Sequence, residues 1–392
     1  MPRRAYSELV PAWTRAALAL FAIGWGANQF AAMLPVYRIE DGASAAEVTL
    51  LFGAYAAGLI PALLLVGPAS DRLGRRRVLR PVLVLSFVAT VVLMLGGHHL
   101  GLLLVGRLLA GVASGAAFAP GTAWVKELSE GPAGTGARRA AIALSAGFGT
   151  GPLVTGLMAQ WLAHATWLPY VPHLVLTVAV SVLVWSAPEP ARPDEGTPRQ
   201  EARRVGQALR SRAFLLAVVP TAPWVFGCAS FAFATVPAVV DVPGPSIAVG
   251  GLVVALTLWT GVLIQPLGRR FGATTTLLVG VSAGVAGFAV ATLAAVLDTG
   301  WLVPVAAIGL GAAYGLILVG GLTIVEQVAR PADLATVTAV FYSLTYIGFA
   351  APYVGTLLLS VLSATTTLVL LAAVLATSAV PARLSGRSAA PR

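Results

Sequence analysis

The sequence predicts an all-α membrane protein with twelve transmembrane helices, arranged as two pseudo-symmetric six-helix bundles. Of the 392 residues, 58% are hydrophobic and 10% are charged, and the mean hydropathy is +0.87. A soluble domain carries roughly 25% charged residues, so this chain has too few polar side chains to cover the surface of a soluble protein. This excludes soluble enzymes, disordered chains and, despite the net charge of +10, nucleic-acid-binding domains.

Apolar runs long enough to cross a bilayer, about 20 residues each, occur twelve times. The first, from Ala16 to Val36, is longer than the apolar core of a signal peptide, and we expect it to be retained. Residues 334–382 are uncharged and long enough for two spans. In order along the chain, the expected spans are 14–37, 46–67, 79–97, 100–124, 140–163, 167–187, 213–240, 246–267, 273–297, 300–325, 335–358 and 363–381.

The basic residues lie in short clusters between these runs and predict the orientation of the chain. With the N-terminus in the cytoplasm, 23 of the 25 basic residues fall on the cytoplasmic side, while Arg38 falls outside and Arg107 lies within a span. Cytoplasmic loops of membrane proteins carry such an excess. We therefore expect a multi-pass protein in the lipid bilayer of the cell membrane, with both termini cytoplasmic. The preference for Arg over Lys is typical of a GC-rich bacterial genome.

A polar, Pro-rich stretch, residues 188–212, is predicted to be a cytoplasmic linker between an N-terminal bundle, residues 1–187, and a C-terminal bundle, residues 213–392. Glycines recur between the halves at offsets of 198 to 201 residues. The pairs are Gly53 with Gly251, Gly74 with Gly272, Gly111 with Gly311, Gly115 with Gly315, and Gly147 with Gly348. A parallel repeat of two six-helix bundles is the layout of a rocker-type secondary transporter.

A basic segment follows the second expected span and reads Gly67-Pro68-Ala69-Ser70-Asp71-Arg72-Leu73-Gly74-Arg75-Arg76-Arg77. It resembles motif A of the major facilitator superfamily, G-x-x-x-D-R-x-G-R-R, with Ala69 where the family has a bulkier residue. The glycines would allow a tight approach, and Asp71 could accept hydrogen bonds from a helix N-terminus and from arginines. The resemblance implies a conformational latch made of Gly67, Asp71, Arg72, Gly74, Arg75 and Arg76. The alternative is a generic basic loop.

The fourth span contains Arg107 followed by Gly111 and Gly115, and resembles motif B of the same family, R-x-x-x-G-x-x-x-G. An Arg at the centre of a span costs roughly 2.5–3.5 kcal/mol on insertion scales. Either Arg107 faces a central cavity and serves proton coupling or substrate binding, or it snorkels to the outer interface. Three further candidates for proton coupling or substrate binding are Asn28, Gln29 and His173. His173 could titrate near neutral pH or could only pack helices.

The fifth span resembles motif C of drug–proton antiporters, G-x-x-x-G-P-x-x-G-G, with Thr155 in place of one glycine. The residues that carry the resemblance, and that we expect to kink and pack this helix, are Gly147, Gly151, Pro152 and Gly156. The alternative is a small-residue face with a proline kink, which is common in membrane helices. Both interpretations involve close helix packing.

Aromatic side chains lie well inside several expected spans. A cavity lined by them would suit an amphipathic organic solute through stacking and cation–π contacts, whereas each ring alone could face lipid or pack helices. The candidates are Trp25, Tyr55, Trp224, Phe226, Phe231, Trp259, Tyr314, Tyr342 and Tyr346.

The motifs together predict the major facilitator fold and a secondary active transporter. We expect export of small amphipathic organic molecules by proton antiport; uptake or facilitated transport of a metabolite is the alternative on the same fold, and a non-transporting receptor is a third. No P-loop occurs, so we expect no ATP hydrolysis, and we expect neither an enzyme nor a cofactor. The basic residues cluster between apolar runs, as in loops that face a membrane, so we expect no nucleic-acid partner. The single Cys228 and the scattered His98, His99 and His164 have no metal-ligand spacing. Substrate, protons and lipid are the expected partners of a monomer.

Overall fold

The computed structural model describes residues 10–97, 99–131, 135–189, 205–268, 270–330 and 334–387, which form helices and connecting turns without a strand. The chain divides into two compact units, Met1–Asp194 and Glu195–Arg392. Each unit is described by itself.

The prediction of twelve spans is confirmed: the described residues contain twelve helices that are long and apolar enough to cross a membrane. Their ends differ from the expected ones by five residues or fewer, mostly because the helices continue beyond the apolar runs. Side chains such as Leu65, Val182 and Leu263 leave 71%, 71% and 72% of their surface exposed and suit contact with lipid.

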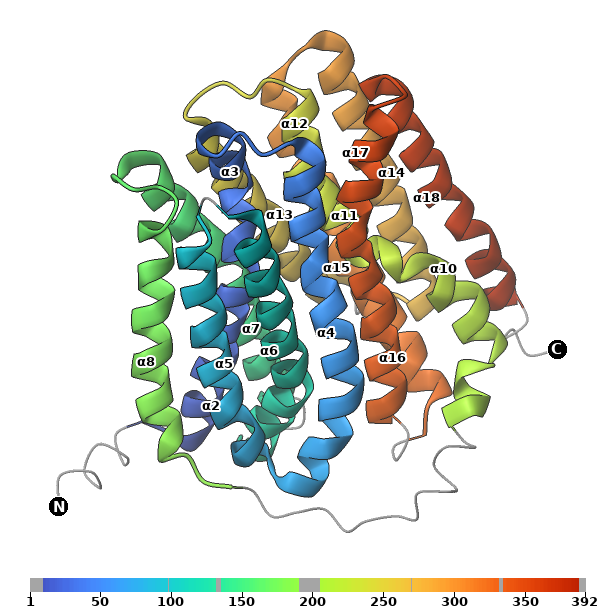
Figure 1. Ribbon diagram of the computed structural model, residues 1–392. Coiled ribbons are helices and arrows are strands. Elements are labelled where there is room, and N and C mark those ends of the chain that lie inside the picture. Colours follow the sequence, from blue (N-terminus) through green and yellow to red (C-terminus); the bar gives the residue numbers. More distant parts are fainter. Residues whose placement is uncertain are drawn as a thin grey trace. The chain divides into compact units, whose positions relative to one another are not determined.

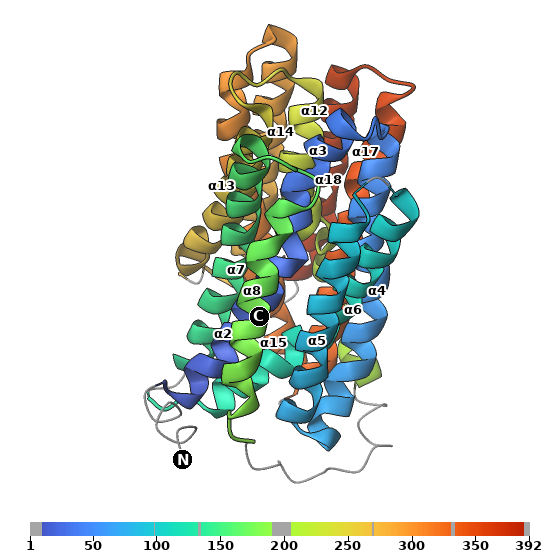
Figure 2. The same ribbon diagram turned by 60° about the vertical axis from the view of Figure 1, so that its left-hand side comes forward.

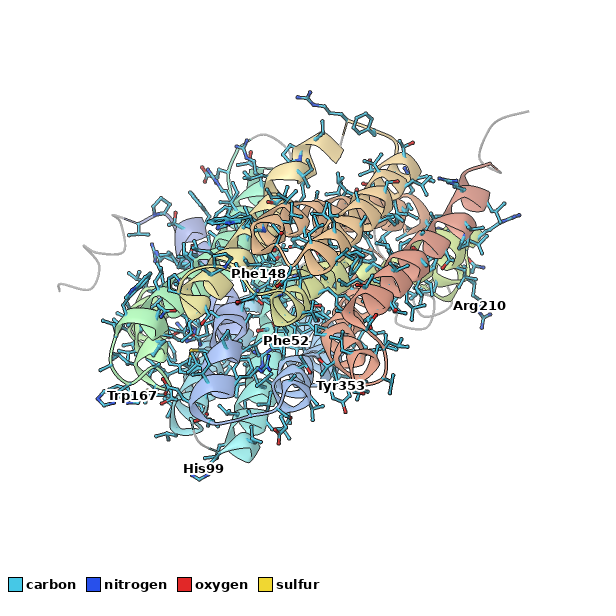
Figure 3. The ribbon with its side chains drawn as sticks, turned by 90° about the horizontal axis from the view of Figure 1, so that it is seen from above. Phe52, His99, Phe148, Trp167, Arg210 and Tyr353 are labelled. Atoms are coloured by element: carbon cyan, nitrogen blue, oxygen red, sulfur yellow. The ribbon has the colours of Figure 1, made fainter. Side chains whose placement is uncertain are left out.

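The first unit contains six spans with short connections (Figures 1 and 2). The first span is broken into α2, a 3-10 segment η1 and α3, and the sixth begins with a 3-10 turn, η2. The bounds are α2 Ala12–Asn28, η1 Gln29–Met33, α3 Leu34–Glu40, α4 Ala45–Leu73, α5 Arg75–Leu95, α6 Leu100–Glu127, α7 Thr135–Trp161, η2 Leu168–Tyr170 and α8 Val171–Trp185. Figure 3 shows Trp167 and His99 at the edge of this unit, whereas Phe52 is buried within it.

The second unit repeats this plan, and Figure 1 shows its α14 and α18 side by side. Its first span contains two π-helical segments, η3 and η4, and its fifth contains a 3-10 turn, η6. The bounds are η3 Phe214–Val218, α10 Val219–Thr221, α11 Pro223–Ser230, η4 Phe231–Thr235, α12 Val236–Val239, α13 Ser246–Gly268, α14 Ala273–Leu297, η5 Gly300–Leu302, α15 Val303–Val328, α16 Leu334–Ile347, η6 Gly348–Ala350, α17 Ala351–Leu359 and α18 Ala364–Arg387.

Glycines bring equivalent pairs of helices into backbone contact in both units. A Cβ atom on Gly111 of α6 would collide with the carbonyl oxygen of Tyr55 on α4, and one on Gly311 of α15 would collide with that of Thr257 on α13. Small residues allow such close approach between membrane helices. The first span of each unit also leaves the regular α-helix at equivalent residues, at η1 and at η4, which are 202 positions apart.

The turn between the second and third spans is shorter than expected. Residues 67–73 continue α4, so the predicted loop is reduced to Gly74, whose φ of +99° is rarely adopted by residues with a side chain. The helix continues through Pro68 and ends only at Gly74.

Orientation in the membrane can be tested by cysteine labelling. Cys228 is buried in α11, so Cys228→Ala provides a background without reactive thiols. In that background we expect Cys at position 138 to be protected in intact cells from an impermeant maleimide, and Cys at position 38 to react, because the charge distribution places them on opposite sides. Both native side chains are exposed. The reverse labelling pattern would contradict the predicted orientation.

Candidate functional site

Arg107 on α6 is fully buried in the first unit. Its guanidinium donates three hydrogen bonds to backbone carbonyl oxygens: Nε to Leu51 at 3.2 Å, Nη2 to Phe52 at 3.1 Å and Nη1 to Ala27 at 3.3 Å. Leu51 and Phe52 belong to α4, and Ala27 lies in the last turn of α2. The side chain therefore ties α6 to α4 and to the end of α2 directly before η1.

Three aromatic rings surround the same guanidinium. Its carbon lies 4.6 Å from the ring centroid of Phe30, 4.7 Å from that of Tyr55 and 5.7 Å from that of Phe52. No carboxylate in the described part of the chain pairs with Arg107. Ring faces and carbonyl dipoles thus solvate the charge, and these contacts hold the guanidinium in the interior of the unit.

A second polar group in this unit lies where α2, α5 and α8 meet. Nδ1 of His173 is 2.8 Å from Oγ1 of Thr90, and Nε2 is 3.0 Å from the carbonyl oxygen of Ala22. Nε2 of Gln29 donates to Oγ1 of Thr90 at 3.2 Å. The side chains of Gln29, Thr90 and His173 are buried, and Asn28, also buried, is the last residue of α2. Gln29 and His173 were predicted from the sequence, whereas Thr90 was not.

The latch residues that the structure describes join α5 to α4, to α6 and to the segment after α8, at one end of the first unit. Arg75 donates from Nη2 to Glu127 on α6 at 3.0 Å and from Nη1 to Ser70 on α4 at 2.7 Å. The backbone N–H of Arg76 donates to Oε2 of Glu189 at 3.0 Å. A Cβ on Gly67 would only touch Ala119 at 3.9 Å, so close approach does not require glycine there.

The side chains of Asp71 and Arg72 lie outside the described residues, so their predicted part in the latch stays a prediction. Glu127 and Glu189 were not predicted as members of the latch. Glu189 follows α8 in the short segment Pro188-Glu189-Pro190, and its carboxylate accepts a hydrogen bond at the N-terminus of α5. An acidic side chain is stabilised there by the unpaired N–H groups and by the helix dipole.

Gly74 provides a stability test of this end of the unit. A Cβ at Gly74 would lie 2.7 Å from Oε1 of Glu189, and the positive φ strains any other residue. We expect Gly74→Ala to lower the free energy of unfolding by about 1–3 kcal/mol, measured as a lower melting temperature in detergent. Gly101→Ala in α6 is the matched control, since nothing lies within 4 Å of its added Cβ. Equal melting temperatures for the two variants would contradict the geometry.

The glycines of the fifth span pack α7 against α2. A Cβ on Gly147 would collide with the carbonyl oxygen of Phe21, and one on Gly151 would lie 2.8 Å from that of Trp25. Pro152 lies inside α7, and Gly156 is buried on the same helix. Trp25 also contacts Phe21, at 5.9 Å between ring centroids. Gly348 is the equivalent of Gly147 in the second unit, and a Cβ there would collide with the backbone of α11 at Pro223 and Gly227.

The predicted aromatic residues form separate groups in the structure. In the second unit, Phe226 stacks on Tyr346 at 4.6 Å and contacts Phe349 at 4.9 Å and Tyr314 at 5.5 Å, and Tyr342 follows Tyr346 at 6.5 Å. We call these five residues the Phe226 cluster. Phe226 was among the predicted aromatic residues and Phe349 was not, and only the contacts between helices show which rings touch.

The other predicted rings pack elsewhere. Trp224 and Phe231 contact Phe288 on α14, at 6.2 and 5.6 Å between centroids. Tyr55 lies beside Arg107, and Trp259 is half-buried on α13. The residues that the structure describes contain no group of three or more His, Cys, Asp or Glu side chains that could hold a metal ion.

Comparisons with known proteins identify similar sequences and folds. Residues 16–352 match the family model of the Major Facilitator Superfamily. Over 202 residues the chain is 28% identical to the multidrug resistance protein MdtL of Escherichia coli O127:H6, an alignment that covers 50% of each chain. The match thus spans about half the length of that relative.

Three solved structures share the fold over nearly their full length. The POT family transporter PepTSo has a TM-score of 0.78 at 13% identity, covering 97% of this chain and 98% of that one. The nucleoside transporter NupG has a TM-score of 0.72 at 12% identity, covering 96% of this chain and 100% of that one. A D-xylose-proton symporter has a TM-score of 0.71 at 16% identity, covering 95% of both chains. At these identities the likeness concerns the fold.

Proposed function

Since this chain belongs to the Major Facilitator Superfamily, it is a multi-pass membrane transporter rather than an enzyme, and we propose that it exports small amphipathic organic molecules by proton antiport. Transport proceeds by alternating access, in which the two six-helix bundles, residues 1–187 and 213–392, expose one site to either side of the membrane in turn. The transporter works as a monomer in the bacterial cell membrane, with both termini in the cytoplasm.

The Phe226 cluster supports the substrate class. Five aromatic rings from α11, α15, α16 and η6 gather in the second unit. Its residues 213–240, 242–268, 271–297 and 299–325 contain no Asp, Glu, Lys or Arg. Such rings bind apolar and aromatic solutes by stacking, and organic cations through their faces. A sugar or a peptide would need more hydrogen-bonding and charged partners than these rings supply.

The likeness to a multidrug resistance protein carries the proposal of export. It agrees with the antiporter-like motif on α7, whose Gly147 and Gly151 pack against α2. An inward proton gradient of one pH unit supports about a tenfold substrate ratio for each proton exchanged, because 1.4 kcal/mol corresponds to a factor of ten.

Everted membrane vesicles with an acidic interior test this function. We expect the transporter to accumulate fluorescent aromatic compounds, with ethidium and rhodamine 6G as the first probes, and to release protons as it does so. Vesicles without the transporter, and vesicles whose gradient is collapsed by a proton–potassium exchanger, are the controls. Uptake that does not depend on the proton gradient would indicate facilitated transport. Uptake only in right-side-out vesicles, driven by protons that move inward, would indicate symport. Either result contradicts the proposal.

A further inference from the structure

Two hydrogen bonds link the side chains of Gln29, Thr90 and His173, and we call this series the polar chain. Its hydrogen bonds have a defined direction when the histidine ring is neutral. Nε2 of His173 faces the carbonyl oxygen of Ala22, which only accepts, so Nε2 carries the proton. Nδ1 is then an acceptor, and the Thr90 hydroxyl donates to it. Oγ1 of Thr90 in turn accepts from the Gln29 amide N–H. Every nitrogen and hydroxyl of the chain is paired in this arrangement.

One polar atom of the three side chains in the polar chain has no hydrogen-bond partner. Oε1 of Gln29 is buried without a hydrogen bond among the described residues, and the side chain is fully buried. Leaving a buried amide oxygen unpaired is unfavourable, so this oxygen is an acceptor held ready for a donor. Gln29 is also the first residue of η1, where the first span leaves the regular α-helix.

A proton added to His173 would use that acceptor. The proton comes from a hydronium ion, whose O–H bond breaks to leave water, and it forms an N–H bond at Nδ1; no covalent bond of the protein breaks. Nδ1–H donates to Oγ1 of Thr90, whose hydroxyl hydrogen turns away toward Gln29. The Gln29 amide then rotates so that Oε1 accepts it. The protonated ring therefore reverses the chain of hydrogen bonds, and the reversal ends at η1.

The equivalent junction of the second unit contains no such chain. The Gln29–Thr90 contact is replaced by the edge-to-face rings of Phe231 and Phe288, which are 202 and 198 positions further along and 5.6 Å apart between centroids. The first unit shows that three helices can meet around polar side chains, and the second shows that the same junction also forms with aromatic ones. The polar chain is thus not required by the fold.

The position of the histidine is also apolar in the second unit. A Cβ on Gly284 of α14 would lie 2.6 Å from Leu375 of α18, which takes the place of His173 on α8, and 3.3 Å from Cys228. In the first unit a Cβ on Gly26 would lie 2.7 Å from Nε2 of His173. Leu375 fills the junction without a titratable group, so packing alone does not explain an imidazole at position 173.

No described charged group faces the ring from the elements packed against α8. From α2, Arg15 donates to Ser186 at the other end of α8. From α5, Arg80 donates to the carbonyl oxygen of Trp185, the last residue of α8, and Arg76 to that of Ala187, just beyond it. From η2, the Tyr170 hydroxyl lies 2.5 Å from that of Tyr37. The positive charge of a protonated His173 would therefore have no described counter-charge in this conformation. Protonation is favoured only in a conformation that admits water to the ring.

We propose that His173 is the proton-binding site of the transport cycle, and that Thr90 and Gln29 pass its protonation state to the break in the first span. This rests on the proposed antiport function. A coupled carrier must bind its proton with different affinities in its two states. The buried arrangement of the structure is the low-affinity, deprotonated state. A state in which the first span moves at η1 and admits water to the ring is the high-affinity state.

Nuclear magnetic resonance of ¹⁵N-labelled histidine tests the site directly. Replacing His98, His99 and His164 with Gln leaves His173 as the single reporter in purified, bilayer-embedded protein. We expect the neutral ring to carry its proton on Nε2 and to gain a second proton within the range in which histidines titrate, about pH 5 to 8. A proton on Nδ1 of the neutral ring, or a ring that stays neutral throughout that range, would overturn the proposal.

Transport by His173→Gln tests the coupling. Gln can form hydrogen bonds in the same place but cannot take up a proton, so we expect exchange of substrate across the membrane without a gradient to persist and proton-driven accumulation to be lost. His99→Gln, which removes an exposed imidazole, is the matched control and should keep both. Full proton-driven accumulation by His173→Gln would overturn the inference while leaving antiport intact. A wild-type protein without proton coupling would instead overturn the proposed function.

A second variant tests the coupling in case His173→Gln does not fold. It is the triple variant Gln29→Phe, Thr90→Phe, His173→Leu. It copies the apolar junction of the second unit, so we expect it to elute as a folded protein in size-exclusion chromatography and to lack proton-driven accumulation. Accumulation at the wild-type level by this folded variant would also overturn the inference. If neither variant folds, the nuclear magnetic resonance titration of His173 remains the test of the proposal.

Discussion

Replacing Arg107 with Ala is expected to abolish transport while the protein still inserts into the membrane. The change removes three hydrogen bonds that join α6 to α4 and to the last turn of α2. Hydrogen bonds to a charged group contribute roughly 1.5–3 kcal/mol each, and the cation–π contacts with Phe30 and Tyr55 are lost as well. The measurement is transport in vesicles at equal expression, together with the melting temperature in detergent.

Two further substitutions separate the charge from the volume of Arg107. Arg107→Met keeps most of the volume, and because removing a buried charge together with its desolvation can stabilise a protein, we expect it to melt above the Ala variant. We expect it to be inactive all the same, since it cannot bind the three carbonyls. Arg107→Lys keeps the charge but not the planar fork, and we expect partial activity at best. Wild-type transport by the Met variant would show that Arg107 only fills space.

The spans could be predicted from sequence because the thickness of the bilayer sets the length of an apolar helix, and hydropathy reports it directly. The positions at which the breaks within spans begin could not: η1 begins at Gln29 and η4 at Phe231, yet neither residue is a helix breaker. Each break is followed by a proline in the first turn of the next helix, Pro35 in α3 and Pro237 in α12, and a proline cannot donate the backbone hydrogen bond of a continuous helix. The sequence does not report the hydrogen bond from Nη1 of Arg107 to the last turn of α2 just before η1.

The candidate site was predicted only as separate residues. Gln29 and His173 are conspicuous because polar side chains are rare in spans, whereas Thr90 is not, since a hydroxyl can pair with its own helix. Its contacts with Gln29 and His173 join residues 61 and 83 positions apart, which no local pattern reports. The same holds for the Phe226 cluster, because hydropathy identifies an aromatic residue but not the ring that it touches.

Gly147→Ala is the second substitution with a large expected effect. The added Cβ would collide with the carbonyl oxygen of Phe21 and lie 2.9 Å from the backbone nitrogen of Trp25. Both are backbone atoms of α2, so a side-chain rotation cannot relieve the contact and the two helices must separate. Overpacking of this kind costs typically about 1–3 kcal/mol. We expect a lower melting temperature and loss of transport, because α2 carries the break at η1.

Gly67→Ala is the matched control, since it is the same substitution in another glycine of a motif. Its added Cβ would lie 3.9 Å from that of Ala119, an ordinary van der Waals distance, and residue 67 lies inside α4. Replacing Gly with Ala within a helix gains about 0.5–1 kcal/mol, so this variant should be at least as stable as the wild type. Gly348→Ala, the counterpart in the second unit, should behave like Gly147→Ala because its Cβ meets the backbone of α11. If Gly147→Ala melted and transported like Gly67→Ala, α7 and α2 could not pack as closely as the structure has them.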